Sequence, residues 1–461
     1  MLDVVFHTLT QGFYFLVFAF LVRCLILLWK PSFPANAPKL VSGYPLVGAV
    51  RLYSDRRGFC RDSKAASPTG NYSYYLGRNR VVGLSGPQGR KTFFENQDLS
   101  LDQGAGLFVA FSSVAERPND PSLETHVSYF RSTVRAALLR TQSLEFVPAA
   151  IDACTTASLN RILAKGLIDP FQELRGLNAQ SSAAVFGIDE VAYSPELSKK
   201  VSDLVSDVDG TFSAADMMVP WLLNPLHIPA MMAVGRAYVM LWQIIRNRKQ
   251  EHHHKRGDSK KDCMLQNLIE KGRSTRAILK IMLTSVFASQ GNSPMVASWL
   301  VIWLATDAHW MARVRQEVDQ VVVKHRKDGE SPEEVLQALD VHSLEHEFPI
   351  LEACLLESIR LAAGLLLFRK NISPTDVPIG DTGEVIPPGA FVTYDAEEAN
   401  LDPGIHPNPQ RWDPGRFLSD DAEHRKVLLG YTGFGTGRRK CRELIPFLVE
   451  YILTLILMAR M

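Results

Sequence analysis

Apolar positions recur with helical spacing over long parts of the chain. The runs from Ile278 to Ala305 and from Leu351 to Leu367 are longer than ordinary strands and predict helices. Residues Thr125 to Arg140 predict a basic amphipathic helix. Alternating and aromatic positions from Asn71 to Ser85, on both sides of Gly77-Arg78-Asn79, predict a short antiparallel hairpin. The pattern indicates a mainly α protein with a minor β region.

Two polar stretches interrupt this pattern. The segment from Asp402 to Pro414 is rich in proline, asparagine and aspartate and predicts an irregular loop. Residues Arg246 to Asp262 are the most polar part of the chain and contain His252-His253-His254. Clustered histidines suggest a metal site, but no second group of ligands is nearby in the sequence. The pattern therefore favours a solvated loop.

Composition narrows the class of protein. The chain has 461 residues, of which 46% are apolar, and a formal net charge of +1. This is enough apolar material for one large helical domain or for two or three smaller ones. The near-neutral charge argues against nucleic acid as a partner. The six cysteines lack paired spacing, which argues against a disulfide framework or zinc site and favours a reducing cytosol.

One of these cysteines carries the clearest chemical signal. Cys441 ends the loop Phe434-Gly435-Thr436-Gly437-Arg438-Arg439-Lys440, which is glycine-spaced and strongly basic. Glycines let the backbone approach a flat macrocycle, and an arginine can pair with a carboxylate at its edge. Cationic surroundings keep a thiol ionised, as a thiolate ligand of haem iron must be. The alternative is a glycine-rich turn with a buried free cysteine.

Two further motifs precede this loop in the sequence. Glu357 and Arg360 lie three residues apart on one face of a predicted helix, and Pro414-Gly415-Arg416-Phe417 ends the irregular loop. In this order, and followed by the cysteine loop, the motifs resemble the cytochrome P-450 superfamily of haem-thiolate enzymes. The resemblance covers nearly the whole chain and implies the cytochrome P-450 fold.

The resemblance also implies roles for individual residues. Cys441 would bind the iron of haem b (iron protoporphyrin IX). Glu357, Arg360 and Arg416 would form a buried triad, in which the loss of one member leaves an uncompensated charge. Arg439 and Arg369 would bind the haem propionates. The other candidate haem contacts are Arg131, Phe434, Gly435 and Gly437, although the basic helix that carries Arg131 is equally consistent with a solvated face.

The predicted helix from Ile278 to Ala305 departs from the usual family pattern. Members usually carry an acid followed by a threonine midway along it, to supply protons for oxygen activation. Here the candidate catalytic residues at these two positions are Gly291 and Asn292. Asn292 can hydrogen-bond an oxygen atom, or it can be a helix-kink residue satisfied by backbone. Pro294 is expected to interrupt the hydrogen-bond ladder and open the helix.

This glycine-asparagine pattern is similar to that of the steroid hydroxylases of bile-acid synthesis and of prostacyclin synthase, so it leaves two chemical classes open. The first is a monooxygenase that inserts one oxygen atom from O2 into an apolar small molecule, with electrons from NADPH-cytochrome P-450 reductase. The second is a reductase-independent isomerase or dehydratase that acts on a peroxide.

Substrate expectations come from the same resemblance. Tyr72 to Gly77 and Val81 to Gly86 are similar to fungal secondary-metabolism members, which suggests a secondary metabolite, terpenoid, steroid or polyketide-like substrate. A loop from Ala363 to Phe368 should form one apolar wall of the pocket. The residues expected to line the pocket are Phe287, Ala288, Ser289 and Leu366.

The N-terminus predicts attachment to a membrane. The apolar segment from about Gly12 to Trp29 is near the length that spans a bilayer, although Arg23 interrupts it. Lys30-Pro31 follows instead of a small-residue cleavage site, which disfavours a signal peptide, and basic residues beyond it place the large domain in the cytosol. We therefore expect a single-pass protein of the endoplasmic reticulum membrane. Its parts would be an N-terminal transmembrane helix (residues 1–30), a proline-rich hinge (31–40) and a haem-thiolate catalytic domain (41–461).

Two features near the C-terminus depart from the family. Glu443 stands where glycine or alanine is usual, and its bulk and charge lie close to the expected thiolate. The sequence ends at Met461, so the terminal hairpin that closes the substrate pocket in family members has no counterpart in it. A truncated pseudoenzyme is therefore a third possibility.

Overall fold

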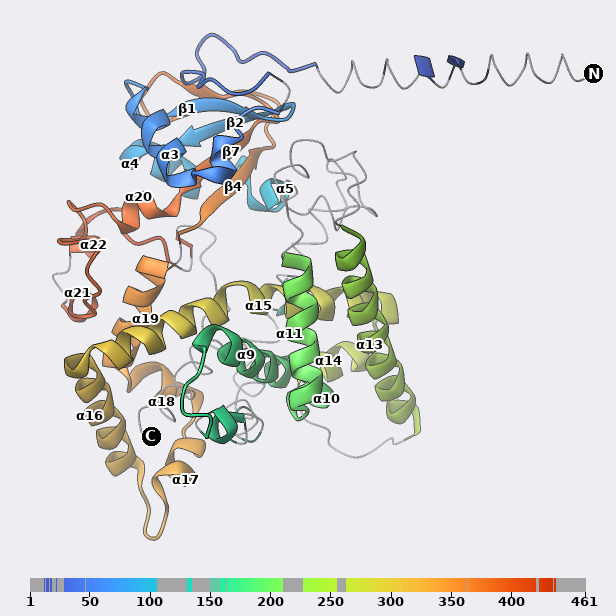
Figure 1. Ribbon diagram of the computed structural model, residues 1–461, viewed down its shortest axis with the longest axis vertical. Coiled ribbons are helices and arrows are strands. Elements are labelled where there is room, and N and C mark those ends of the chain that lie inside the picture. The colour runs from blue at the N-terminus through green and yellow to red at the C-terminus, as the bar shows by residue number, and fades with distance from the viewer. Residues whose placement is uncertain are drawn as a thin grey trace, which may run out of the picture. The chain divides into compact units, whose positions relative to one another are not determined.

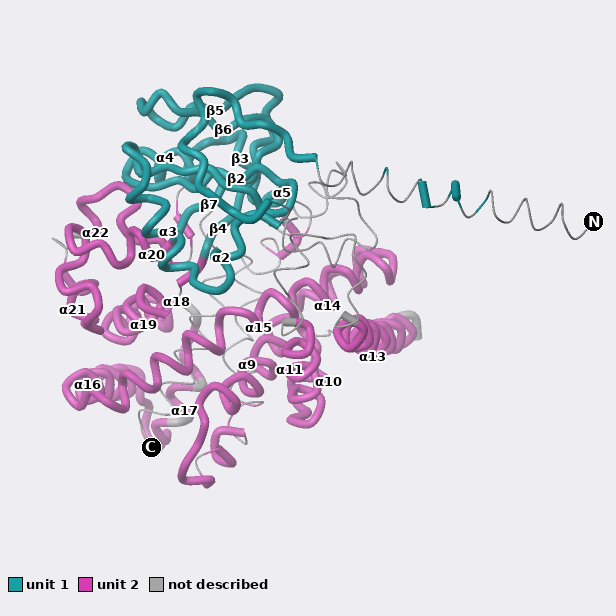
Figure 2. Tube along the Cα trace, turned by 45° about the horizontal axis from the view of Figure 1, so that its top comes forward, with its two compact units in different colours: residues 1–124, 213–223, 366–395 teal, residues 125–212, 224–365, 396–461 magenta. Residues whose placement is uncertain are grey.

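The structure, a computed structural model of the chain, divides into two compact units (Figure 2). It describes residues 29–45, 47–105, 164–209, 227–254, 263–362, 364–419, 423–433 and 435–436, with isolated positions between 12 and 22 and between 130 and 162. Unit 1 comprises residues 1–124, 213–223 and 366–395, and unit 2 comprises residues 125–212, 224–365 and 396–461. The described strands all belong to unit 1, whereas the described part of unit 2 consists of helices and their connections.

Unit 1 is built on a five-stranded sheet in the order β1-β2-β7-β4-β3 (Figure 1). The strands are β1 (Tyr72–Leu76), β2 (Asn79–Leu84), β3 (Leu99–Ser100), β4 (Leu366–Asn371) and β7 (Phe391–Asp395). β1 and β2 form the predicted antiparallel hairpin, with Tyr72 opposite Gly83 and Leu76 opposite Asn79. β2 pairs in parallel with β7, and β4 pairs antiparallel with both β7 and β3. A separate two-stranded sheet contains β5 (Val377–Pro378) and β6 (Val385–Ile386).

Aromatic side chains on one face of β1 pack the sheet of unit 1 against a helix. The short helices of this unit are α2 (Arg51–Ser54), α3 (Arg56–Ala65), α4 (Gly86–Glu95) and α5 (Leu101–Ala105). The rings of Tyr72 and Tyr74 meet Phe59 of α3 edge-on, with ring centroids 6.0 and 5.3 Å apart. The Tyr74 hydroxyl is 3.1 Å from Thr393 Oγ1 of β7, and burial raises its pKa. Alternation along β1 thus places this aromatic pair in the core.

Unit 2 is arranged around α15 (Thr275–Thr306), the longest of the described helices (Figure 1). α15 packs against α9 (Pro170–Phe186), α13 (His227–His254) and α19 (Pro349–Ala362). The caps of α9 follow from sequence: Asp169 accepts a hydrogen bond from the Phe171 N–H, and Gly187 ends the helix with φ at +77°. The remaining helices are α10 (Asp189–Ala192), α11 (Pro195–Asp209), α14 (Met264–Glu270), α16 (Ala308–His325), α17 (Pro332–Gln337), α18 (Val341–His346), α20 (Ala396–Asn400), α21 (Gly415–Leu418) and α22 (Glu423–Lys426).

The structure corrects two local predictions and places Pro294 inside a helix. The helix expected from Leu351 to Leu367 ends at Ala362, and residues 366–368, expected in a loop, belong to β4 because pairing with β7 satisfies their backbone groups. Pro294 lies inside α15 without ending it. Residues 246–254, expected to form a loop, continue α13. Arg248 explains this continuation, because it donates hydrogen bonds to both carboxylate oxygens of Glu190 and to the Gly187 carbonyl.

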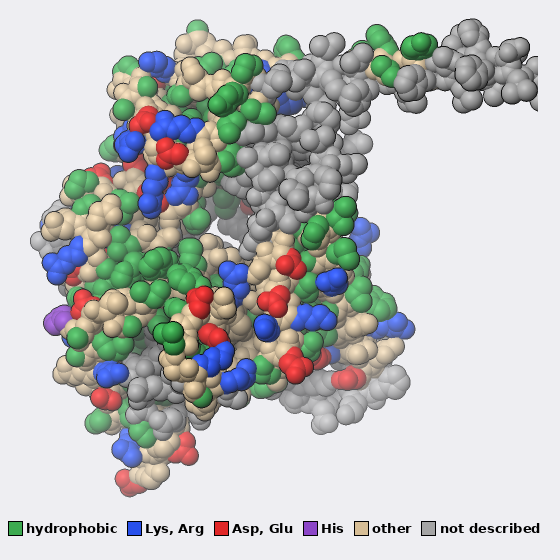
Figure 3. All heavy atoms as spheres, in the orientation of Figure 1, with side chains coloured by type: hydrophobic (Ala, Val, Ile, Leu, Met, Phe, Trp, Pro, Cys, Tyr) green, Lys and Arg blue, Asp and Glu red, His purple; other side chains and the backbone are tan. Residues whose placement is uncertain are grey.

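The membrane anchor expected from Gly12 to Trp29 lies largely outside the described residues, as does the helix expected from Thr125 to Arg140. Within the described part of the chain, one helix is long and apolar enough to cross a bilayer. It runs from Ile228 to Glu251 in α13, has a mean hydropathy of 1.4 and is 33% buried. Large apolar side chains lie at the surface near the start of α13 (Figure 3). The exposed set on this helix is Ile228, Met231, Met232, Tyr238, Val239 and Trp242.

Candidate active site

The first element of the candidate site is an ion pair on α19. Glu357 and Arg360 are 0% and 1% exposed, and Arg360 Nε lies 2.7 Å from Glu357 Oε2. The second guanidinium bond to this carboxylate, from Nη2 to Oε1, is 2.8 Å long. The remaining N–H groups of Arg360 donate to the carbonyls of Asn400, Pro409 and Arg411 at 2.6, 2.8 and 3.3 Å. All five N–H groups of this guanidinium therefore have acceptors, as a buried arginine requires.

Arg416 joins this pair from a different part of the chain. Its Nε donates to Glu357 Oε1 at 3.1 Å, and the Asp413 N–H donates to the same oxygen at 2.9 Å. The carboxylate thus faces two guanidinium groups and one backbone amide, which compensates the cost of burying its charge. The structure brings together the three residues Glu357, Arg360 and Arg416, which the sequence places up to 59 positions apart.

Several residues that sequence reasoning missed complete this network. Trp412 stacks on Trp303 and meets Trp310 edge-on, with ring centroids 5.9 and 6.5 Å away, and its Nε1 donates to Ser358 Oγ at 3.1 Å. His406 is 1% exposed, and burial together with the nearby Arg360 lowers its pKa to about 4. The signal for the turn around Asp413 was present in the Asp-Pro-Gly sequence. Nothing local in the sequence marks the other residues.

Only the beginning of the cysteine loop is described. Gly435 has a φ of +68°, a conformation that glycine adopts without strain. The segment just before it, Gly430 to Thr432, is hydrogen-bonded to other parts of unit 2. The predicted ligand and most predicted haem contacts lie outside the described residues. These are Cys441, Phe434, Gly437, Arg439 and Arg131, together with Glu443.

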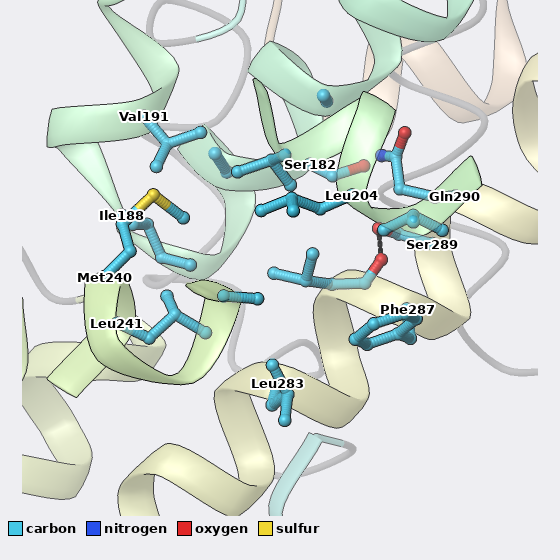
Figure 4. A pocket seen from close by; sticks show the side chains of 16 residues that line it. Ser182, Ile188, Val191, Leu204, Met240, Leu241, Leu283, Phe287, Ser289 and Gln290 are labelled. Atoms are coloured by element: carbon cyan, nitrogen blue, oxygen red, sulfur yellow. Dashed lines mark hydrogen bonds between the residues drawn. The ribbon is translucent and has the colours of Figure 1, made fainter. Parts of the chain in front are cut away.

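The two faces of α15 differ in character. Ala288, Gly291 and Asn292 are exposed on one face, where a Cβ added at Gly291 would meet no atom within 4 Å. Phe287 and Ser289 instead line an internal cavity of about 20 Å³ between α15 and helices α9, α11 and α13 (Figure 4). The predicted pocket residues of α15 are therefore divided between an accessible face and the helical core.

The remaining predicted residues, Leu366 and Arg369, lie on β4 in unit 1. Arg369 is only 4% exposed, and its guanidinium lies 4.8 Å from the centroid of the Phe93 ring and 3.4 Å from the Phe94 carbonyl. Gly104 of α5 packs against the backbone of Arg369, where a Cβ would approach its Cα to 2.4 Å. A rigidly held guanidinium of this kind suits a bidentate carboxylate partner.

These observations agree with the donor set expected for haem. Gly435 has the positive φ of a glycine turn, Arg369 offers a buried guanidinium, and Gly291 leaves open space beside Asn292. Each feature corresponds to one requirement of a haem site: close approach of the backbone, binding of a carboxylate, and open space beside α15. The described residues of each unit, taken separately, are therefore of the kinds that a haem needs.

Comparisons with known proteins agree with this geometry. The family model described as "Cytochrome P450" matches residues 72–442. The chain is 26% identical to cytochrome P450 monooxygenase AacuE of Aspergillus aculeatus, covering 92% of this chain and 85% of that protein. It is 25% identical to cytochrome P450 monooxygenase nsrP of Aspergillus novofumigatus, covering 90% and 81%. A retinoic acid-bound cyanobacterial cytochrome P450 of known structure superposes with a TM-score of 0.69 at 20% identity, over 93% of this chain and 92% of that one.

Proposed function

The chain belongs to the cytochrome P450 family, and we propose that it is a membrane-attached monooxygenase that oxidises an apolar small molecule with electrons from NADPH-cytochrome P-450 reductase. Its curated relatives include several cytochrome P450 monooxygenases of fungi. The observation that carries the proposal is the complete Glu357–Arg360–Arg416 network. Such a network is costly to bury, and here it connects α19 to the segment that leads toward Cys441.

We assign the residues of the haem site as follows. Cys441 would hold the iron as a thiolate, with Phe434, Gly435 and Gly437 shaping the loop around it. Arg439 and Arg369 would bind the propionates, and Arg131 is a further candidate. The chemistry that a thiolate-bound haem supplies is the reductive activation of O2. Arg369 supports this assignment because its guanidinium is already buried and fixed by aromatic contacts.

We propose that Asn292 orients a water molecule by hydrogen bonds and does not itself donate a proton. Its amide does not titrate at physiological pH, so it cannot replace the usual acid as a proton donor. It can hold a water molecule by donating from Nδ2 and accepting at Oδ1, and that water would relay a proton from bulk solvent, to which Asn292 is exposed. Gly291, which stands at the position of the acid, leaves room for such a water because a Cβ there would meet nothing within 4 Å.

The substrate is proposed to be apolar and of secondary-metabolite, terpenoid, steroid or polyketide type. Of the residues expected to line its pocket, Ala288 and Leu366 would provide apolar surroundings, whereas Phe287 and Ser289 face the cavity inside the helical core. Among more distant relatives, a sterol 14-alpha demethylase of Aspergillus fumigatus is 26% identical over 53% of this chain. That relative's name supports a steroid within the proposed range.

Attachment to the endoplasmic reticulum membrane is proposed from two apolar features. Residues 1–30 would form the transmembrane anchor and residues 31–40 the hinge that precedes the catalytic domain, residues 41–461. The exposed apolar side chains of α13, which begin at Ile228 and end at Trp242, offer a second surface with affinity for lipid.

The test is a reduced, carbon-monoxide difference spectrum of the full-length protein in membranes. The wild-type protein should show a Soret band shifted far to the red, and Cys441→Ser should lose it. Cys263→Ser is the matched control, because Cys263 stands at the N-cap of α14, where serine is favoured. Retention of the shifted band by Cys441→Ser would show that another residue binds the iron.

Turnover then separates the two chemical classes. A monooxygenase should form product only with NADPH, reductase and O2 present together. Product formed from a peroxide substrate without reductase would instead identify an isomerase or dehydratase. A protein with the shifted band but without turnover under either condition would contradict both proposed activities.

A further inference from the structure

Three consecutive residues ahead of Cys441, the anchor segment Gly430–Thr432, are each bonded to a different part of unit 2. The Gly430 carbonyl is 3.2 Å from Nε2 of the buried His406 in the irregular segment. The Tyr431 hydroxyl donates to the Leu356 carbonyl of α19 at 3.1 Å. These contacts join stretches of chain that lie 24 and 75 residues apart in sequence.

The third residue, Thr432, contacts α20 through both its backbone and its side chain. Its backbone N–H donates to Asn400 Oδ1 at 3.1 Å. Its hydroxyl lies 3.0 Å from the same oxygen and 3.1 Å from the Ala396 carbonyl, so its single proton serves one of these two acceptors of α20. The backbone carbonyl of Asn400 accepts from Arg360 at 2.6 Å. Asn400 therefore links the anchor segment directly to the Glu357–Arg360–Arg416 network.

The backbone next to the anchor segment adopts a conformation that its sequence does not favour. Leu429 has a φ of +57°, although a leucine side chain disfavours the left-handed region by about 1–2 kcal/mol. Gly430 follows, where a Cβ would approach the His424 carbonyl oxygen to 2.7 Å. Strain of this kind persists only where surrounding contacts determine the conformation, and it concentrates at functional sites. The contacts of residues 430–432 lie directly beside Leu429 and can hold it in this conformation.

We propose that the anchor segment positions the loop that carries Cys441, with the Asn400–Thr432 contact as its main determinant. Thr432 precedes Cys441 by nine residues, and it is the last anchored residue before that loop among those the structure describes. Asn400 and Thr432 are positioning residues, because they act on the thiolate through the loop and touch no reacting atom. The inference rests on the proposed role of Cys441 as the iron ligand.

The physical consequence concerns the strength of thiolate ligation. A loop that leaves its anchor samples conformations in which the sulfur is displaced from its ligating position, and a displaced thiolate takes up a proton. Removing one hydrogen bond changes such an equilibrium by ~1 kcal/mol, or about fivefold in the ratio of the two forms. The reduced carbon-monoxide spectrum measures this ratio, because thiolate-bound haem and haem without a thiolate ligand absorb at different wavelengths.

The experiment compares Thr432→Val with Thr432→Ser in the full-length protein. Valine keeps the shape and the backbone N–H of threonine but removes the hydroxyl, whereas serine keeps the hydroxyl. We expect Thr432→Val to lower the ratio of shifted to unshifted band about fivefold, and Thr432→Ser to keep the wild-type ratio. Equal ratios in wild type and Thr432→Val, or an equal loss in both variants, would overturn the inference.

Tyr431→Phe provides a second measurement, which also serves if Thr432→Val yields no folded protein. It removes only the hydroxyl that donates to Leu356. The ratio of bands should again fall, while an unchanged ratio would overturn the inference. A wild-type protein without the shifted band would overturn the role of Cys441 and the anchor together. A shifted band that survives every anchor variant would overturn the anchor alone.

Discussion

Replacement of Arg360 by lysine is the perturbation whose cost the structure defines best. Arginine donates five hydrogen bonds from a planar fork, and all five are made at this position. Lysine retains the positive charge but has three N–H donors on a single nitrogen. At least two of the five acceptors must therefore lose the donor that residue 360 provides, although Glu357 Oε1 and the Arg411 carbonyl each keep a bond from Arg416. The Glu357 carboxylate and the Asn400 carbonyl are buried, so water cannot replace a missing donor there at low cost.

The expected magnitude follows from this count. A hydrogen bond to a charged group contributes about 1.5–3 kcal/mol, so two lost bonds cost about 3–6 kcal/mol. Breaking a buried ion pair outright costs about 3–5 kcal/mol, which is the same range. Either figure is a large fraction of the total stability of a typical protein, about 5–15 kcal/mol. We therefore expect Arg360→Lys to be strongly destabilised despite its unchanged charge.

Urea unfolding measures this loss, with Arg61→Lys as the matched control. Arg61 undergoes the same chemical change on the surface of α3, where its side chain is 76% exposed and pairs with Asp62. Exposed pairs contribute little, so the control should unfold at nearly the wild-type urea concentration. The Arg360→Lys midpoint should fall by the equivalent of at least about 3 kcal/mol. A midpoint as close to wild type as that of the control would refute the bond count.

Two further predictions concern pH. Burial and Arg360 lower the pKa of His406 from 6.5 to about 4, so its contribution to stability is complete above pH 6.5 and is lost as pH falls through 4. Between pH 6.5 and 4, the free energy of unfolding should fall less in His406→Asn than in wild type, by up to about 3 kcal/mol. Urea unfolding at several pH values measures this difference. Burial raises the pKa of Glu317 from 4.5 to about 7, although its carboxylate accepts from the Ile350 and Leu351 N–H groups at 2.7 and 3.0 Å. The contribution of Glu317 to stability is complete below pH 4.5 and is lost as pH rises through 7. Between pH 5 and 8, the thermal midpoint of Glu317→Gln should therefore fall less than that of wild type. Variants that follow the wild-type pH profile would contradict these assignments.

Local patterns predicted the elements whose stabilising contacts are local. The hairpin of β1 and β2 pairs residues separated by a short turn, and its alternation was visible in the sequence. β4 was not predicted, because its first residue, Leu366, pairs with Asp395, which is too far away in the sequence to appear in a local pattern. The polar end of α13 was misread for the same reason, since Arg248 depends on Glu190 of α10. Tertiary pairing overrode local polarity at both positions.

The candidate site shows the same division. Glu357 and Arg360 could be found because their spacing on one helix face is a local signal, and Arg416 followed from a motif of known order. Asn400 and His406 could not be found, because their roles arise from contacts with residues 24 to 40 positions away. A buried asparagine and a buried histidine have no distinguishing sequence context. Their importance becomes apparent only when the acceptors of Arg360 and the anchors of the cysteine loop are traced.

The behaviour of α15 at Pro294 bears on how Asn292 can act. Proline has no N–H, so the carbonyl four residues earlier loses its helical donor, and the helix was expected to open there. The helix nevertheless continues through Pro294. On its buried face, Asn178 of α9 donates to the Ser289 carbonyl at 3.2 Å, and Ser298 of α15 itself donates from Oγ to the Pro294 carbonyl at 2.7 Å. Asn292, on the opposite and exposed face, therefore projects from continuous helix. A side chain that must orient a water molecule benefits from this rigidity, because its direction is fixed before the substrate arrives.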